Sequence, residues 1–404
     1  MKQLFFFFNK NIKKKNNFLS FKCINLIIIV FFLLIIKRNY NKNFKRNYLF
    51  IQRLKILIKG KNFIRKCLKG LLFNHNHNSN YIINKPKISV IIPIYNCAKT
   101  IKSSIRSIQN QNLSEIEIIL VNDFSNDNSL NIIKGMQKQD HRIKIINNNK
   151  NMGTLYSRCL GVLYSKGKFI FALDNDDMFF DEDVFYNITE IAEKGNFDII
   201  GFKSICAKSF YTKIYKIRDN HFSNHKNNLI LHQPELGIYP ISRNGEYSPN
   251  DYNIWGKCIK NGIYKKGVNL LGKNRYSNYI IWAEDTAMVF ILFNIATSFK
   301  YIHKYGIIHL YSDFNVSSNI KLINKLLGEI FLLEVIFDFS KNNFYKNYAA
   351  YHALFIKNRY NVKKLLIKKK LLNLRNIINK IIKCKYITDK NKNIIKEKYK
   401  DIYY

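Results

Sequence analysis

Residues 88–93 read ISVIIP, a continuous run of mostly β-branched side chains that a proline ends. Uninterrupted apolar runs of this length are typical of strands buried on both faces of a parallel sheet. Working outward, three further apolar runs follow, at residues 116–121, 143–146 and 168–173. Segments with the apolar spacing of a helix lie between them, at residues 98–109, 130–139 and 154–165. This alternation predicts an α/β fold with a doubly wound, mostly parallel sheet flanked by helices.

Polar side chains follow three of the predicted strands. Tyr95 follows the first, Asp123 the second, and the sequence DNDD at residues 174–177 the fourth. Ligands of such sheets collect at the carboxyl ends of the strands, so these side chains are expected to share one site. Three carboxylates within four residues repel one another, and a divalent cation bound to phosphate oxygens would offset that repulsion.

Structural roles are an alternative explanation for the same acids. Asp177 and Asp181 could cap the helix that follows them, while Asp174 makes a turn. Asp123 could be the N-cap of the helix expected near Leu130.

Several blocks, in order, resemble the family 2 glycosyltransferases, which have the GT-A fold. The blocks are SVIIPIYN at 89–96, EIILVNDFSND at 117–127, NMG at 151–153 with Ser157, Arg158 and Gly161, KGK at 166–168 running into LDNDD, NIWGK at 253–257 and AEDT at 283–286. The resemblance extends from about residue 86 to residue 312. It implies a GT-A domain at 86–315, with a nucleotide-sugar half at about 86–200 and an acceptor half at about 201–315.

The resemblance also implies a role for each matching residue. On the donor side, Pro93 and Tyr95 would border the nucleotide base, Asp123 would accept a hydrogen bond from it, Arg158 would lie near the nucleotide or its phosphates, and Asp174 would face the ribose. Asp176 would hold Mg²⁺ or Mn²⁺ on the diphosphate. Asp285 would be the general base, with Trp255, Lys257 and Glu284 on the acceptor side.

Two of these blocks have structural alternatives. Trp255 could be an ordinary core residue. Glu284 and Asp285 could be a helix N-terminus, where the dipole favours acidic side chains, and that position would not exclude catalysis.

The chain departs from the family pattern in two places. Phe124 occupies the position of the glycine usual in the family's D-G-S turn, so this turn is expected to have a different shape. The basic residue often found beyond the E-D block is missing from residues 311–317, and His309 or Lys304 could replace it.

The ends of the chain carry most of its charge. The 67 Lys and Arg against 27 Asp and Glu give a formal charge of +40, which divides as +18 for residues 1–70, +13 for 357–404 and +9 between. Runs of Lys and Asn also fit an AT-rich coding bias, which leaves a functional basic surface as an open alternative. The seven cysteines are scattered singly, which argues against a zinc ribbon or a disulfide scaffold.

The amino terminus predicts attachment to a membrane. Residues 23–36 are uncharged and, apart from Asn25, apolar, and Lys22 could extend the run to residue 18 by snorkelling, towards the roughly 20 residues that span a bilayer. We expect an uncleaved anchor within residues 1–38 and a basic stem at 39–85. A signal peptide or a buried segment are the alternatives, and the basic residues on both sides of the run leave its orientation open.

Residues 316–404 predict a basic helical extension. Residues 365–382 read LLIKKKLLNLRNIINKII, which could lie on an anionic membrane or pack its apolar face on the catalytic domain.

Together these features predict a single-pass membrane protein, in the endomembrane system if the source is eukaryotic. Its function would be that of an inverting glycosyltransferase. It would move a sugar from a nucleotide-diphosphate sugar, with UDP as the expected nucleotide, to a hydroxyl of a glycan, lipid or protein. The alternative is a non-catalytic basic protein that binds a membrane or nucleic acid through a degenerate glycosyltransferase fold.

Overall fold

The computed structural model describes residues 86–208, 218–219, 229–233, 253–311, 320–340, 343–362 and 368–403. All of them belong to one of the two compact units into which the chain divides, Cys67–Tyr404. The expected anchor at 1–38, the stem at 39–85 and the boundary at residue 316 lie outside the described residues. Within the described part of the chain, no helix is both long enough and apolar enough to cross a bilayer.

The strand–helix alternation expected from the sequence is confirmed. The strands of the first half are β1 (Ile88–Ile94), β2 (Ile116–Asn122), β3 (Ile143–Asn147), β4 (Phe169–Ala172) and β5 (Met178–Phe179). Its helices are α4 (Ile101–Gln109), α5 (Ser129–Gln139), α6 (Thr154–Tyr164) and α7 (Val184–Lys194). The first two strands are buried along their whole length, as continuous apolar runs require.

The second half of the domain adds further strands to the same sheet and further helices around it. Its strands are β6 (Ile199–Lys208), β7 (Arg218–Asp219), β8 (Ile230–His232), β9 (Lys257–Lys260) and β10 (Ser298–Tyr311). Its helices are the short η2 (Ile254–Gly256), α9 (Asn261–Leu271), α10 (Lys273–Tyr276) and α11 (Glu284–Ile295). The chain then continues into α13 (Leu322–Phe339), α14 (Asn343–Arg359), α16 (Lys368–Lys383) and α17 (Asp389–Tyr403).

The sheet is mixed rather than mostly parallel. Its strand order is β3-β2-β1-β4-β9-β6-β10-β5, with β7 beside β6 and β8 beside β10. Strands β1 to β4 pair only in parallel with one another. Strand β9 pairs antiparallel with β4 and β6, whereas β10 pairs in parallel with β6. The expectation of a mostly parallel sheet was therefore right for the first half alone, because β9 lies between β4 and β6 and runs antiparallel to both.

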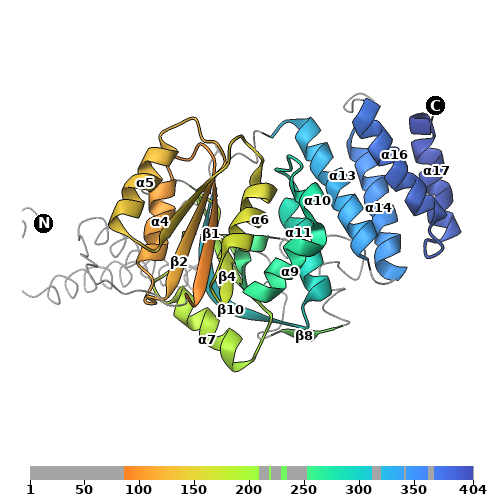
Figure 1. The fold of residues 1–404 in the computed structure, drawn as a ribbon. Coiled ribbons are helices and arrows are strands. Elements are labelled where there is room, and N and C mark those ends of the chain that lie inside the picture. Colours follow the sequence, from red (N-terminus) through yellow and green to blue (C-terminus); the bar gives the residue numbers. More distant parts are fainter. Residues whose placement is uncertain are drawn as a thin grey trace, which may run out of the picture. The chain divides into compact units, whose positions relative to one another are not determined.

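Helices cover both faces of the sheet. In β1, Val90 and Ile92 point into the core under α4, α5 and α7, and Ile91 points to the face covered by α6, α9 and α11. Figure 1 shows α6, α9 and α11 side by side along that second face. Gly161 allows α6 to approach β1 closely, because a Cβ there would lie 2.5 Å from the Ile91 side chain.

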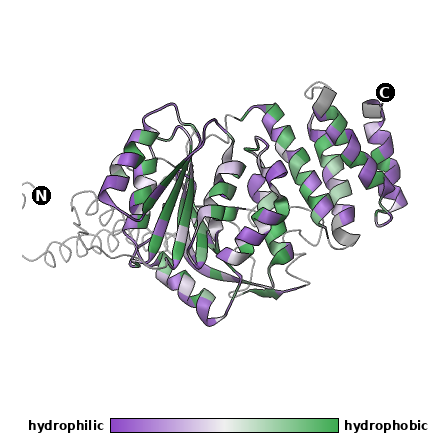
Figure 2. Cartoon of the chain, viewed as in Figure 1, coloured by the Kyte–Doolittle hydropathy of each residue, from purple (hydrophilic) through white to green (hydrophobic). Residues whose placement is uncertain are grey.

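The carboxyl-terminal helices pack on one another and, through α13, on α11. The apolar face of α16 is buried there, with Leu374, Ile378 and Ile381 each 0% exposed. Figure 2 shows hydrophobic colour concentrated on the central strands and hydrophilic colour on α17. The apolar face of α16 is therefore buried within the protein, but against α13, α14 and α17 rather than directly on the catalytic domain as the alternative had it.

Candidate active site

The strand ends bring the expected site residues to one edge of the sheet. The backbone N–H of Asp123, after β2, donates to the carbonyl of Ile94 at the end of β1 (2.8 Å). The side-chain amide of Asn175, after β4, donates to the carbonyl of Pro93 (3.0 Å). Pro93 itself is buried within β1, whereas Tyr95 just beyond it is 36% exposed. Parallel pairing thus places three separate segments beside one another.

Asp123 organises the loop that follows β3. Its buried carboxylate accepts hydrogen bonds from the backbone N–H groups of Met152 and Gly153 (both 2.8 Å) and from the side-chain amide of Asn148 (2.7 Å). The N-cap residue of α5 is Asn128, so the alternative that Asp123 caps this helix is wrong. Asn148 could not be singled out in the sequence, because it lies in a run of three asparagines.

Arg158 connects the two halves of the domain. It projects from α6 and is 4% exposed. Its Nη2 lies 2.9 Å from Asp174 Oδ1, and its Nη1 lies 2.5 Å from Asp285 Oδ1. A buried guanidinium needs such partners, because an uncompensated charge in the interior is very unfavourable. The arginine expected near the donor phosphates therefore holds together a carboxylate of the DNDD cluster and one of the E-D block.

The E-D block begins helix α11, so the helix N-terminus proposed as an alternative is observed along with the contact to Arg158. Ala283, immediately before it, has a φ of 59°, a left-handed conformation that is uncommon for a residue other than glycine. Asp285 also accepts a weak hydrogen bond from the backbone N–H of Ile254 (3.3 Å). Burial, and then the charge of Asp285, raise the pKa of Glu284 to about 8. Burial also raises the pKa of Asp285, although the charge of Arg158 opposes this effect. Arg158 lies closer to Asp285 (2.5 Å) than to Glu284 (3.9 Å), so its charge favours the ionised form of Asp285 over that of Glu284.

The two neighbouring aspartates of the cluster differ in their surroundings. Asp177 is fully buried and accepts hydrogen bonds from the backbone N–H of Leu310 (3.0 Å) and from His309 Nδ1 (2.9 Å). It thus joins the β4–β5 turn to β10 and does not cap α7. The carboxylate of Asp176 accepts no hydrogen bond from another described residue, and burial followed by the charges of Asp177 and Asp174 raises its pKa to about 7.

This donor set suits a divalent cation held by a single protein carboxylate and by phosphate oxygens. Among the residues that the structure describes, no three or more Asp, Glu, His or Cys side chains are grouped as a metal site. Mg²⁺ commonly takes only one or two carboxylates together with substrate phosphates. The unpaired carboxylate of Asp176, with a raised pKa beside two other acids, fits that mode of binding.

His309 is the basic side chain that lies beside the aspartates at residues 174–177. Its ring stacks on Trp255, with centroids 5.2 Å apart and planes 9° apart. Although burial lowers the pKa of His309, the charges of Asp177, Asp174 and Asp176 outweigh this effect and raise it to about 9. Lys304, the other residue considered for this role, is exposed and donates to Asn187 (3.2 Å) instead.

Two of the three residues expected on the acceptor side, Trp255 and Lys257, are buried. Trp255 is 7% exposed, so it is a core residue that also forms one wall behind His309. Lys257 is 5% exposed, and its ammonium donates to the carbonyl of Asn253 (2.6 Å). Lys257 therefore supports the segment that contacts Asp285.

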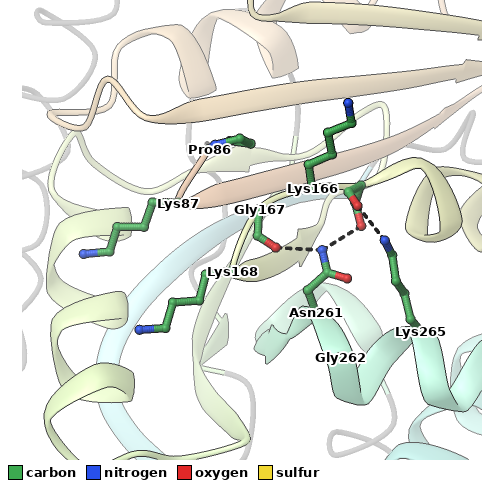
Figure 3. Close-up of a pocket in the computed structure, with 9 residues that line it drawn as sticks. Pro86, Lys87, Lys166, Gly167, Lys168, Asn261, Gly262 and Lys265 are labelled. Carbon is green, nitrogen blue, oxygen red and sulfur yellow. Dashed lines mark hydrogen bonds between the residues drawn. The ribbon is translucent and has the colours of Figure 1, made fainter. Parts of the chain in front are cut away.

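A separate cavity of about 550 Å³ lies at the opposite edge of the sheet, where β1, β4 and α9 begin. Figure 3 shows its lysine side chains spread around Gly167 and Asn261. Lys87 and Lys168 both bind Glu193, and Lys265 donates to the carbonyl of Ser165. None of the residues expected to act in the site lines this cavity.

Comparison with known proteins identifies the class. Residues 89–243 match the family model described as glycosyl transferase family 2. The structure resembles that of Staphylococcus aureus TarS residues 1–349 in complex with UDP-GlcNAc, with a TM-score of 0.55 and 15% identity over 78% of this chain and 89% of that one. At that identity the likeness shows the fold alone, which is the GT-A-like fold expected. The chain thus contains a family 2 glycosyltransferase domain, as its sequence predicted.

The curated relatives carry glycosyltransferase names. The uncharacterized glycosyltransferase EpsJ of Bacillus subtilis is 39% identical over 116 residues, which are 29% of this chain and 33% of that protein. The cholesterol galactosyltransferase of Borreliella burgdorferi is 27% identical over 253 residues, 60% of this chain and 65% of that protein. An uncharacterized glycosyltransferase of Methanocaldococcus jannaschii is 29% identical over 44% of this chain and 67% of its own length. The matches of 36–41% identity therefore span only 15–38% of the relatives' own length.

Proposed function

We propose that this protein is a metal-dependent, inverting glycosyltransferase that moves a sugar from a nucleotide-diphosphate sugar, with UDP as the nucleotide, to an acceptor hydroxyl. The observation that carries the proposal is the bridge through Arg158, which joins Asp174 to Asp285 although the two aspartates are more than a hundred residues apart in the chain. The names of the relatives, and the TarS complex with UDP-GlcNAc, support the reaction and the type of donor.

Each of these residues has a separate role in the proposed reaction. Asp285 takes the proton of the acceptor hydroxyl as its oxygen forms a bond to the anomeric carbon, and the bond from that carbon to the diphosphate breaks on the opposite side. The guanidinium of Arg158 favours the ionised form of Asp285, against the effect of burial, and fixes its orientation. Asp176 would hold Mg²⁺ or Mn²⁺, which when bound supplies positive charge beside the departing diphosphate. His309, when protonated, would add a second positive charge near the departing diphosphate.

The remaining assignments are those that the resemblance to the family implies. Pro93, Tyr95 and Asp123 belong to the base end of the donor site, and Asp174 to its ribose side. Trp255, Lys257 and Glu284 belong to the acceptor side. We propose in addition that residues 1–38 anchor the protein in a membrane, and flotation of the full chain with liposomes tests this.

Donor hydrolysis and transfer by the full chain with Mn²⁺, measured across a panel of nucleotide sugars, test the proposal. We expect Asp285→Asn and Asp176→Ala each to lower the rate at least about a hundredfold, as loss of a general base or a metal ligand does. Glu190→Gln is the matched control, because Glu190 is a solvent-exposed acid on α7, and its rate should equal that of the wild type. Turnover that survives both substitutions would contradict the mechanism. Salt-sensitive RNA binding with no turnover would favour the non-catalytic alternative.

A further inference from the structure

Phe124 holds a backbone conformation that suits glycine. It follows Asp123 at the end of β2, and its φ is 62°, in the left-handed region. Large side chains are unfavourable there because Cβ crowds the neighbouring carbonyl group, so an aromatic residue in this conformation is an outlier. The sequence departs from the family glycine at this position, yet the turn keeps the conformation that glycine would adopt most easily.

Hydrogen bonds from both sides fix this turn against the end of β1. Asn96 N–H donates to Ser125 Oγ (3.2 Å), and Asn126 N–H donates to Asn96 Oδ1 (2.8 Å). Ser125 N–H in turn donates to Asn122 Oδ1 (3.3 Å). Because these hydrogen bonds hold the residues around Phe124, Phe124 cannot change to a negative φ without breaking some of the bonds. Strain that the surroundings maintain is common at binding and catalytic sites.

The ring of Phe124 is not used in the core. It is 52% exposed, and two more exposed aromatic side chains, Tyr95 (36%) and Tyr279 (45%), belong to the same edge. Burial, then the proximity of Tyr95 and of Asp123, raise the pKa of Tyr279, which places its phenol near both residues. Tyr279 gave no signal in the sequence. Aromatic side chains from three separate segments thus lie near Asp123.

We propose that Phe124 is a donor-binding residue whose ring stacks on the base of the nucleotide, and that the left-handed turn persists because it presents this ring. The inference deepens the proposed function and rests on it. Bases stack on aromatic rings through their π faces, with little dependence on base identity. Phe124 would therefore increase affinity for the nucleotide as a whole, while polar groups beside it select the base.

Two variants separate the ring from the backbone. Phe124→Ala removes the ring and keeps a Cβ in the left-handed region, whereas Phe124→Gly removes the ring and the strain together. We expect both to weaken binding of UDP about tenfold in calorimetric titrations of the full chain with Mn²⁺, and to leave the affinity for pyrophosphate unchanged. Thermal unfolding should show a higher midpoint for the glycine variant than for the alanine variant. Tyr164→Ala, which removes a 61% exposed ring from α6, is the control and should bind UDP as the wild type does.

The outcomes distinguish this inference from the function on which it rests. If the wild type binds none of UDP, CDP, ADP, GDP and TDP, the proposed function fails and the inference fails with it. If the wild type binds one of them and both variants bind it equally well, only the inference is overturned. If the alanine variant alone loses affinity, the backbone rather than the ring matters, and the stacking role is likewise overturned.

Discussion

Glu117 shows how one buried acid fixes the geometry of the nucleotide half. It lies on β2 and is 3% exposed, where the hydroxyl of Ser89 on β1 donates to it (2.6 Å). Lys144 on β3 binds its second oxygen (2.5 Å), and the backbone N–H of Gly167 donates to the first (3.1 Å). A Cβ at Gly167 would lie 2.5 Å from the Ser89 nitrogen, so only glycine allows this approach. One carboxylate therefore ties three strands and the turn before β4 together.

Replacing this acid should change how stability depends on pH. Burial alone would raise the pKa of Glu117, but the bonds from Lys144, Ser89 and the Lys166 backbone outweigh burial and lower it. The stabilisation is therefore complete above the pKa of the unfolded chain, about 4.3, and is lost as pH falls through the lower folded value. We expect Glu117→Gln to lower the free energy of unfolding by about 2 kcal/mol at pH 7.

The measurement is urea unfolding of the wild type and Glu117→Gln from pH 7 down to pH 3. The difference in the free energy of unfolding between the two proteins should shrink as pH falls below about 4. Glu190→Gln on α7 provides the control: the pKa of Glu190 is also lowered, by Lys194, but this ion pair lies in solvent, so the variant should differ little from the wild type at any pH. A difference that is constant over this range would mean that Glu117 acts through packing alone.

At the scale of elements, helix α13 supports the loop that leads into the E-D block. Trp282 Nε1 donates to Glu329 on α13 (2.9 Å), and the ammonium of Lys325 lies 4.8 Å from the centroid of the Trp282 ring. Gly328 lies directly against the Trp282 backbone, since a Cβ there would overlap its carbonyl oxygen. Residue 283, which has the left-handed conformation, follows at once. The position of Asp285 therefore depends on a helix beyond the segment matched by the family model.

Two glycines in the middle of helices should respond in opposite ways to alanine. Gly328→Ala is expected to lower the free energy of unfolding by about 1–3 kcal/mol, because α13 and residue 282 must move apart. Gly135→Ala in α5 is the matched control, since nothing lies within 4 Å of a Cβ there, and it should raise stability by about 0.5–1 kcal/mol. Chemical denaturation measures both, and a Gly328→Ala variant as stable as the wild type would refute the close contact.

At the scale of the molecule, one hydrophobic core runs from the sheet to the last helix. A single cluster of buried side chains includes Ile91 on β1, Leu332 on α13 and Tyr399 on α17. The hydroxyl of Tyr399 donates to the carbonyl of Ala353 on α14 (2.5 Å). Because the same core is shared, we expect the helices after residue 320 to unfold together with the sheet.

A substitution in α17 tests this cooperativity. Tyr399→Ala should lower the free energy of unfolding by about 3 kcal/mol, as truncation of a buried aromatic side chain does. The variant should still unfold in a single thermal transition, at a lower temperature than the wild type. Calorimetry and the loss of UDP binding should report the same midpoint. Tyr351→Ala on α14 is the control, because that ring is 54% exposed, and its effect should stay within about 0.5 kcal/mol. A separate early transition for the carboxyl-terminal helices would contradict a shared core.

Local patterns were sufficient for the first half of the fold. The strands near residues 88, 116, 143 and 169 are short β-branched runs, and such runs are recognisable because both of their faces must be buried. The second half was not predictable in the same way. Strand β9 pairs with β4 and β6, and β10 runs beside β6, so partners distant in the chain decide the order and direction.

The sequence by itself determined the family, the alternation of strands and helices, and the acids that gather at the strand ends. These features depend on side-chain periodicity and on motifs within a few residues. Only the tertiary structure decided that Arg158 joins Asp174 to Asp285, that Asp123 closes a loop, that the sheet is mixed and that the apolar face of α16 is buried. The physical reason is that a buried charge or apolar face takes its partner from whatever the fold brings within a few ångströms, and sequence separation does not set that distance.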